Sequence, residues 1–208
     1  MNGATVVVLG GSGFVGRHLV ARLVAAGNRV VVPTRSRERA RHLILLPTVD
    51  VVEADVHDPA ALASLVRGAA TAINLVGILN ESRPGDFERV HVELPRKLIA
   101  ACRDSSVPRL LHMSALNADR KAPSGYLRSK GEAEALIAAS GLQWTIFQPS
   151  IIVGPEDSFL NLFARLQHWL PVIALACAGA RFQPIGVDDV ASAYLRALDE
   201  DATRGRPY

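Results

Sequence analysis

Six short apolar runs alternate along this sequence with longer segments of helical character. Because the runs are almost continuously apolar, they indicate strands buried on both faces, and hence a parallel sheet covered by helices. We expect strands at Ala4–Leu9, Arg29–Thr34, Val49–Ala54, Thr71–Val76, Arg109–Met113 and Gln143–Gln148. We expect helices at Phe14–Ala26, Arg37–Leu46, Pro59–Arg67, Asp86–Ser105 and Tyr126–Ser140. This alternation predicts an α/β fold of the Rossmann type, with a doubly wound parallel sheet.

The regular alternation ends near residue 150, which divides the sequence into residues 1–150 and residues 151–208. We interpret the second part as a partial C-terminal substrate lobe with a returning strand and helix. Its last residues, Arg204–Tyr208, are typical of a turn that leads into a strand which the sequence does not contain, so we expect the lobe to be truncated. Before them, in order, come a Gly154-Pro155 turn, an amphipathic stretch Phe159–Trp169, a strand-like run Arg181–Ile185 and a helical run Asp188–Leu198.

The amino-acid composition indicates which kinds of partner and which cellular compartment to expect. With 49% apolar residues, 21% charged residues and a net charge of +3, the sequence is typical of a globular domain. Aromatic residues, on which bases stack, make up only 5%, so we expect no nucleic-acid partner. Cys102 and Cys177 have neither metal-ligand nor CxxC spacing, which favours a reducing compartment and predicts no metal site. The first residues of the sequence lack the basic region of a signal peptide. The longest uncharged apolar run, Leu170–Ala180, is shorter than the roughly 20 residues of a membrane span, so we expect a cytoplasmic protein.

A glycine-rich turn joins the first expected strand to the first expected helix. Gly10, Gly13 and Gly16 give the spacing G-x-x-G-x-x-G, and Ser12, Phe14 and Val15 lie between them. Glycine lets the main chain approach a pyrophosphate closely, and the helix N-terminus that follows offers free N–H groups to the anion. A plain tight turn is the alternative interpretation. Because the spacing occurs between a strand and a helix, it favours a dinucleotide site and makes residues 1–150 an NAD(P)-binding domain.

The end of the second expected strand indicates which dinucleotide is preferred. NAD sites place an Asp or Glu about 20 residues after the glycine turn, where it binds the ribose hydroxyls. Here Arg35 and Arg37 follow the strand, and the first carboxylate is Glu38. Because a guanidinium can bind a 2′-phosphate through two hydrogen bonds, we expect NADP(H) rather than NAD(H), with Arg35 as the main contact. The alternative is that these arginines only cover an exposed helix, although basic residues oppose the dipole at a helix N-terminus.

Two other strand ends carry candidate side chains. Asp55 and Val56 follow the third expected strand, where they can contact the adenine ring, although an aspartate there fits a cap or a loop almost equally well. Ser114 follows the fifth expected strand and is a candidate for orienting a substrate carbonyl or hydroxyl. A loop serine with a satisfied hydroxyl is the alternative for Ser114.

Tyr126 and Lys130 are four residues apart on an expected helix, and therefore share one of its faces. A lysine ammonium in this position lowers the pKa of a neighbouring phenol and can also donate to the nicotinamide ribose. The phenol is then a general acid or base beside the hydride-transfer carbon. Ser124, two residues before the tyrosine, is a candidate N-cap of the same helix.

These features together resemble the short-chain dehydrogenase/reductase superfamily, in particular its extended or atypical members of the NAD-dependent epimerase/dehydratase kind. The glycine turn, Asp55, the Tyr126/Lys130 pair and the segment from Pro149 to Pro155 carry the resemblance. More narrowly, four segments are similar to the NAD(P)H-binding accessory subunit of respiratory complex I and its bacterial relatives: Ile73–Gly77, His112–Ala118, Tyr126–Lys130 and Pro155–Asn161. The similarity extends from about residue 5 to the end of the sequence.

The resemblance implies dinucleotide contacts beyond the glycine turn. It assigns Tyr126 and Lys130 to the cofactor as well as to catalysis, and it places His91 where many members carry an asparagine. The further contacts that it implies are Leu75, Val76 and Gly77 at a strand end, and Pro149, Ile151 and Ile152 in a turn. Many relatives form a homodimer through two helices that correspond to Asp86–Ser105 and Tyr126–Ser140.

Two functions follow as hypotheses. The first is an NADP(H)-dependent oxidoreductase or epimerase-like enzyme, in which Tyr126 is the acid or base, Lys130 assists it and Ser114 orients an unknown small-molecule substrate. The second is a non-catalytic accessory or assembly subunit of a complex I-type respiratory NADH:quinone oxidoreductase, in which NADPH is a fixed structural ligand. This second function would place the protein at the inner face of a membrane, as a peripheral part of a redox complex.

Overall fold

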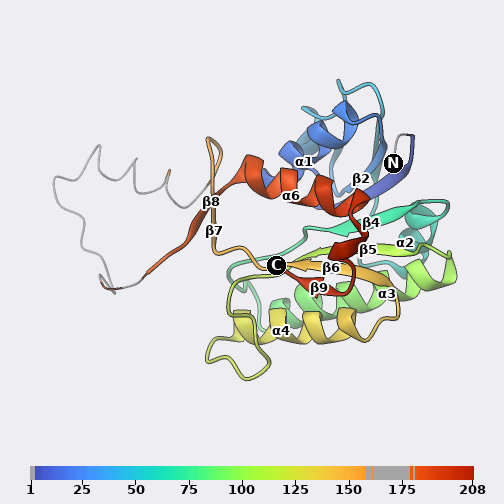
Figure 1. The fold of residues 1–208 in the computed structure, drawn as a ribbon. Helices are drawn as coiled ribbons and strands as arrows, with labels where there is room; N and C mark the ends of the chain where they lie inside the picture. Colours follow the sequence, from blue (N-terminus) through green and yellow to red (C-terminus); the bar gives the residue numbers. More distant parts are fainter. Residues whose placement is uncertain (1–2, 158–160, 162–178, 180) are drawn as a thin grey trace.

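The computed structural model describes residues 3–157, 161, 179 and 181–208 (Figure 1). Seven parallel strands form its central sheet in the order β3-β2-β1-β4-β5-β6-β9. The strand order reverses between β1 and β4, as it does at the switch point of a doubly wound sheet. The predicted Rossmann-type fold is therefore confirmed. The strands are β1 (Thr5–Leu9), β2 (Arg29–Thr34), β3 (Val49–Glu53), β4 (Thr71–Asn74), β5 (Arg109–Met113), β6 (Gln143–Phe147) and β9 (Arg206–Pro207).

Helices cover both faces of the sheet (Figure 1). On one face lie α1 (Phe14–Ala25) and α6 (Val187–Asp199), whose Leu19, Leu23 and Tyr194 join one buried core. On the other face lie α2 (Pro59–Val66), α3 (Leu94–Asp104) and α4 (Gly125–Ala138), which contribute Leu62, Leu98 and Ile137 to a second core. Within the described residues, no helix has both the length and the apolar character that crossing a membrane requires.

The long helix predicted at Asp86–Ser105 is in fact two segments. A π-helical segment, η2 (Glu88–Glu93), leads directly into α3. Pro95 has no N–H for the carbonyl of His91 four residues earlier, so the ordinary ladder of helical hydrogen bonds is interrupted there. The predicted single helix therefore changes its hydrogen-bond pattern where α3 begins.

The helix predicted at Arg37–Leu46 is wrong. Only one 3-10 turn, η1 (Arg37–Ala40), forms there, and turns follow it. Ser36 makes no capping hydrogen bond with its side chain, and the basic residues of the segment oppose the dipole of a longer helix. Buried Ala40 and Leu43 hold the segment against the core instead.

Three expectations for the C-terminal part need correction. The turn expected at Pro149–Ile152 enters a short strand, β7 (Ile151–Val153), which pairs in parallel with β8 (Pro184–Gly186), and the strand expected at Arg181–Ile185 begins only at β8. The chain end also contains the strand that the sequence did not reveal. There β9 pairs with β6, and the N–H of Tyr208 donates to the carbonyl of Ile146 at 2.9 Å. The stretch Phe159–Trp169, except Asn161, and Cys177 lie outside the described residues.

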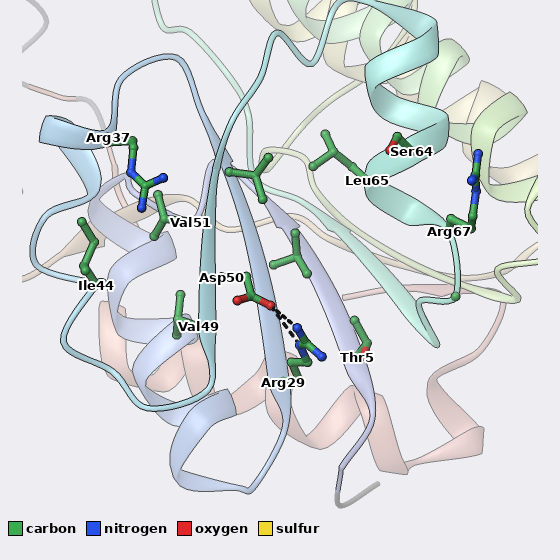
Figure 2. A pocket seen from close by; sticks show the side chains of 13 residues that line it. Thr5, Arg29, Arg37, Ile44, Val49, Asp50, Val51, Ser64, Leu65 and Arg67 are labelled. Carbon is green, nitrogen blue, oxygen red and sulfur yellow. Dashed lines mark hydrogen bonds and ion pairs between the residues drawn. The ribbon is translucent and has the colours of Figure 1, made fainter.

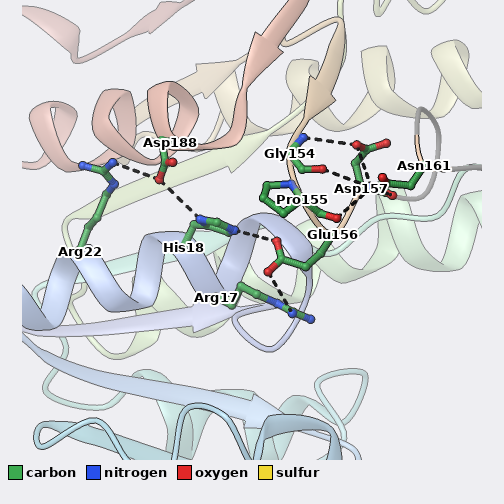
Figure 3. Close-up of polar contacts among 9 residues, drawn as sticks. All are labelled: Arg17, His18, Arg22, Gly154, Pro155, Glu156, Asp157, Asn161 and Asp188. Atoms are coloured by element: carbon green, nitrogen blue, oxygen red, sulfur yellow. Dashed lines mark hydrogen bonds and ion pairs between the residues drawn. The ribbon is translucent and has the colours of Figure 1, made fainter. Parts of the chain in front are cut away.

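Polar contacts connect the segment after β7 to both helices on its face of the sheet (Figure 3). His18 of α1 lies 3.1 Å from a carboxylate oxygen of Glu156 and 3.5 Å from one of Asp188 at the start of α6. Arg22 pairs with Asp188 at 3.1 Å. These contacts hold α1, α6 and the residues that follow β7 together at the surface.

Candidate functional site

The glycine turn between β1 and α1 requires glycine at two of its positions, Gly10 and Gly16. Gly10 has a φ of +80°, which favours glycine. A Cβ at Gly16 would lie well under 3.0 Å from the carbonyl oxygen of Gly10 and from main-chain atoms of Gly11. Gly13 precedes α1 and gives it no side-chain cap, so the first N–H groups of the helix remain available to an anion. The turn therefore has the form of a cradle for a diphosphate.

A cleft of about 1010 Å³ extends from this turn along the carboxyl ends of the strands. Ligands of open α/β sheets bind at this edge. Eight of the predicted cofactor contacts line the cleft, namely Gly10, Ser12, Gly13, Arg35, Val56, Leu75, Val76 and Gly77. The structure thus brings together the glycine turn and the ends of β2, β3 and β4.

The other predicted contacts lie outside the lining of this cleft. Phe14, Val15 and Gly16 form the first turn of α1, while Asp55 accepts the N–H of His57 at 2.9 Å, as a loop aspartate does. Pro149 accepts the N–H of Leu116 at 2.9 Å and borders a separate hollow, and Ile152 packs against the core beneath α1 and α6. Ile151 lies beside it in β7. Their role as cofactor contacts stays a prediction.

The cleft is also lined by three arginines that were not predicted as cofactor contacts: Arg39 of η1, Arg83 in the connection before η2, and Arg89 within η2. This connection is braced by its own carboxylates. Asp86 accepts the N–H groups of Ser82 and Arg83 at 3.1 and 2.9 Å, and it pairs with Arg89 at 3.2 Å. The guanidinium groups of Arg89 and Arg35 both lower the pKa of His57 in the cleft, after the larger effect of burial. Positive charge therefore acts on the cleft from both of its walls.

The predicted Tyr126/Lys130 pair lies on α4, near the end of β5. Ser124 caps this helix by accepting the N–H of Leu127 at 3.1 Å, as predicted. The Nζ of Lys130 donates to the carbonyl of Met113 at 3.1 Å, and a Cβ at Gly77 would lie 3.1 Å from it. The lysine is therefore held between the end of β5 and a lining residue of the cleft.

The electrostatics of the pair differ from the prediction. Burial raises the pKa of the Tyr126 phenol above its ordinary value, so the lowering expected from the Lys130 ammonium is wrong for this arrangement. Burial also lowers the pKa of Lys130 itself to about 8, although the Glu134 carboxylate opposes the change. Loss of hydration is thus the largest cause of both shifts. The phenol keeps its proton at neutral pH, which suits an acid that donates a proton.

Ser114 lies next to the residue that holds Lys130. Its N–H donates to the carbonyl of Phe147 at 2.7 Å, and the residue is 3% exposed. Its hydroxyl is buried and has no hydrogen-bond partner among the described residues. Ser114 therefore does not fit the alternative of a satisfied loop serine, and its role in orienting a substrate stays a prediction.

A second hollow, of about 710 Å³, lies over β3 and the first residues of β1 and β2, between α2 and the segment that contains η1 (Figure 2). Thr5 and Arg29 are the first residues of β1 and β2, and Gly68 precedes β4. An ion pair between Arg29 and Asp50, at 2.7 Å, spans neighbouring strands in it. None of the predicted site residues lines this hollow, so the candidate site is the cleft at the carboxyl ends.

The profile of a family described as NAD(P)H-binding matches residues 10–161 of this chain. The chain belongs to this NAD(P)H-binding family. Its curated relatives include the mitochondrial NADH dehydrogenase (ubiquinone) 1 alpha subcomplex subunit 9 of Mus musculus, which is 33% identical over 100% of this chain and 56% of that protein. Ceramide reductase of Caulobacter vibrioides is 32% identical over 90% of this chain and 58% of that protein. The chain thus spans little more than half the length of these relatives.

Solved structures show the same fold for this NAD(P)H-binding chain. Pen from Bacillus thuringiensis superposes with a TM-score of 0.86 at 15% identity, covering 96% of this chain and 66% of that one. UDP-glucuronic acid 4-epimerase from Bacillus cereus gives a TM-score of 0.82 at 17% identity, covering 98% and 76%. The predicted resemblance to the complex I subunit is confirmed by the curated relative, and the likeness to the epimerase structure shows the shared fold.

Proposed function

We propose that this NAD(P)H-binding chain prefers NADP(H) and acts as an oxidoreductase on a carbonyl or hydroxyl carbon of a small-molecule substrate. The charge of the cleft carries the proposal. Arg35, Arg39, Arg83 and Arg89 line it, against a single carboxylate, Asp86, which is already engaged by main-chain N–H groups and Arg89. This excess of guanidinium groups suits a dinucleotide with an additional 2′-phosphate.

The residues present fit such a dinucleotide. Gly10 and Gly16 let the turn pack closely on the main chain around it, and the helix after the turn begins without a side-chain cap, which leaves N–H groups for a diphosphate. Arg35 follows β2 at the point where NAD sites carry a carboxylate. At the other end, the buried hydroxyl of Ser114 and the Nζ of Lys130 lie beside the end of β5. When bound, the dinucleotide would supply or accept the hydride.

Three polar residues would supply the proton transfer and the positioning of the substrate. Because burial keeps the Tyr126 phenol protonated, this side chain would donate a proton to a carbonyl oxygen during reduction. Lys130 lies four residues further along the same helix, and its cation would stabilise the negative charge left on the phenol. Ser114 would hold the substrate oxygen with its free hydroxyl. An epimerase-like reaction would use the same groups in both directions.

An affinity comparison tests the preference for NADP(H). Arg35→Ala should weaken NADPH binding by roughly 1.5–3 kcal/mol, the range for a hydrogen bond to a charged group, and leave NADH binding almost unchanged. Arg37→Ala is the matched control, since Arg37 lines the second hollow and not the cleft. Wild-type protein that binds NADPH and NADH equally well would contradict the preference.

A second candidate function is a structural subunit that holds NADPH without turnover. The similarity to the complex I subunit supports it, and it would place the chain at the periphery of a membrane-bound redox complex. Purified protein should then retain NADPH that added ketones or quinones do not oxidise. The oxidoreductase predicts instead that NADPH is oxidised, and that Tyr126→Phe abolishes the oxidation with NADPH affinity intact.

A further inference from the structure

His91 connects two parts of the site that are distant in sequence. It lies in η2, and it is 1% exposed. Its Nε2 lies 3.0 Å from the N–H of Ile78, beside the cleft residue Gly77, and its Nδ1 lies 2.8 Å from the Oγ of Ser129. Ser129 Oγ donates to the carbonyl of Tyr126 at 2.8 Å. One imidazole thus links the main chain after β4 to the main chain of the proposed acid.

The direction of these hydrogen bonds determines where the proton of the ring lies. A main-chain N–H can only donate, so Nε2 accepts from Ile78 and carries no hydrogen. A carbonyl can only accept, so the Ser129 hydroxyl donates its hydrogen to the main-chain carbonyl of Tyr126. The Ser129 oxygen therefore accepts a hydrogen bond from Nδ1 of His91. The ring is therefore neutral and protonated on Nδ1. In agreement, burial, aided by the Lys130 charge, lowers the pKa of His91 to about 3.

Packing holds the same ring from other directions. Phe87 stacks on it with a centroid distance of 5.4 Å, and the Tyr126 ring meets it edge-on at 5.6 Å. A Cβ at Gly77 would lie 3.1 Å from Lys130 Nζ and 3.6 Å from His91 Nε2. The strand end and the two side chains are therefore in close contact, and movement of the ring would displace them.

We propose that His91 is a positioning residue, which holds the Gly77–Ile78 strand end in register with Tyr126 and Lys130 as a neutral ring and takes no part in proton transfer. Its effect on coenzyme binding rests on the proposed function, whereas its protonation state does not. A π-helical turn often occurs at functional sites, and here it contains the side chain that makes the connection.

Nitrogen NMR of the full chain labelled at histidine tests the protonation state directly. We expect one ring with hydrogen on Nδ1 only, unchanged from about pH 5 to about pH 9, whose signals disappear in His91→Gln. His112 gives an internal reference with the opposite tautomer, since the amide of Asn74 donates to its Nδ1 at 3.2 Å while the Asn74 oxygen accepts from Val76. Ser129→Ala should shift the Nδ1 signals of the first ring only. Hydrogen on Nε2 of His91, or titration near its ordinary pKa, would overturn the proposal.

Coenzyme affinity tests the positioning role. His91→Phe keeps the shape of the ring but leaves the N–H of Ile78 without an acceptor, so the Kd for NADPH should rise by about tenfold. His91→Gln supplies an acceptor oxygen and should restore most of the affinity. Equal affinities for wild type and both variants would refute the positioning role. If His91→Phe does not fold, the Kd of His91→Gln for NADPH is compared with that of wild type instead. A Kd more than about tenfold above the wild-type value would refute the acceptor role. Wild type that does not bind NADPH would refute the proposed function, while the NMR result would still stand.

Discussion

Gly16 gives the sharpest test of how the glycine turn works. In Gly16→Ala, the new methyl group would lie well under 3.0 Å from the Gly10 oxygen and from main-chain atoms of Gly11. Backbone atoms cannot rotate away as a long side chain can, so α1 must move outward. Overpacking of this kind costs about 1–3 kcal/mol, and we expect a loss near 3 kcal/mol because several main-chain atoms are involved. NADPH binding should weaken by more than tenfold, since the N–H groups at the start of α1 move with the helix.

Gly13→Ala is the matched control in the same turn. Its Cβ would lie 3.2 Å from the same Gly10 oxygen, and its φ of −79° is open to any residue. We expect a loss of less than about 1 kcal/mol, because the neighbour needs to give by only a few tenths of an ångström. Equilibrium urea unfolding and NADPH fluorescence titration measure both variants. Equal losses at the two positions, or normal NADPH binding by Gly16→Ala, would refute the steric argument.

Three further predictions concern stability. The Arg109 guanidinium donates to Gln143, Thr145, Ala197 and Thr203 at 2.7–2.9 Å, so Arg109→Ala should destabilise the fold by about 3 kcal/mol or more in urea unfolding, and an unchanged midpoint would contradict this. Burial lowers the pKa of Lys130 from 10.5 to about 8, so between these two pH values the unfolded chain binds more protons than the folded chain, and the free energy of unfolding should rise with pH. Lys130→Met should lack this rise, and its free energy of unfolding at neutral pH should be about 3 kcal/mol higher than that of wild type. The Arg22 side chain lowers the pKa of Asp188, so this carboxylate stabilises the fold at a pH above the ordinary pKa of an aspartate, and the contribution is lost as acid protonates it. The free energy of unfolding of Asp188→Asn should therefore fall less on acidification than that of wild type.

The strands and the glycine turn were predictable because their signals are local. A buried parallel strand is apolar along its whole length, and Gly10, Gly13 and Gly16 lie within seven consecutive residues. The N-cap at Ser124 is local as well. β9 was missed because it consists of Arg206 and Pro207 and pairs through its main chain, so its residue types carry no strand signal.

The rest of the site depends on contacts between distant segments. Arg83, in the connection before η2, and Arg89, in η2, line the cleft some 50 residues after Arg35, and nothing in their local sequence marks them as binding residues. The hydrogen bond between His91 and Ser129 joins residues 38 positions apart. The pKa of Tyr126 was predicted with the wrong sign because spacing reveals the neighbouring lysine but not the burial of the phenol.

The position of α6 has a consequence for how the chain folds. Val190 and Tyr194 of this helix share a core with Leu19 and Leu23 of α1, although about 170 residues separate them. Tyr194 is fully buried and stacks on Phe147 at 4.0 Å. A fragment that stops at residue 150 would leave this surface bare to water, so we expect it to aggregate rather than to form an autonomous nucleotide-binding unit. The segment from α6 to Tyr208 therefore completes the core of the preceding sheet, and both parts should unfold in a single cooperative event.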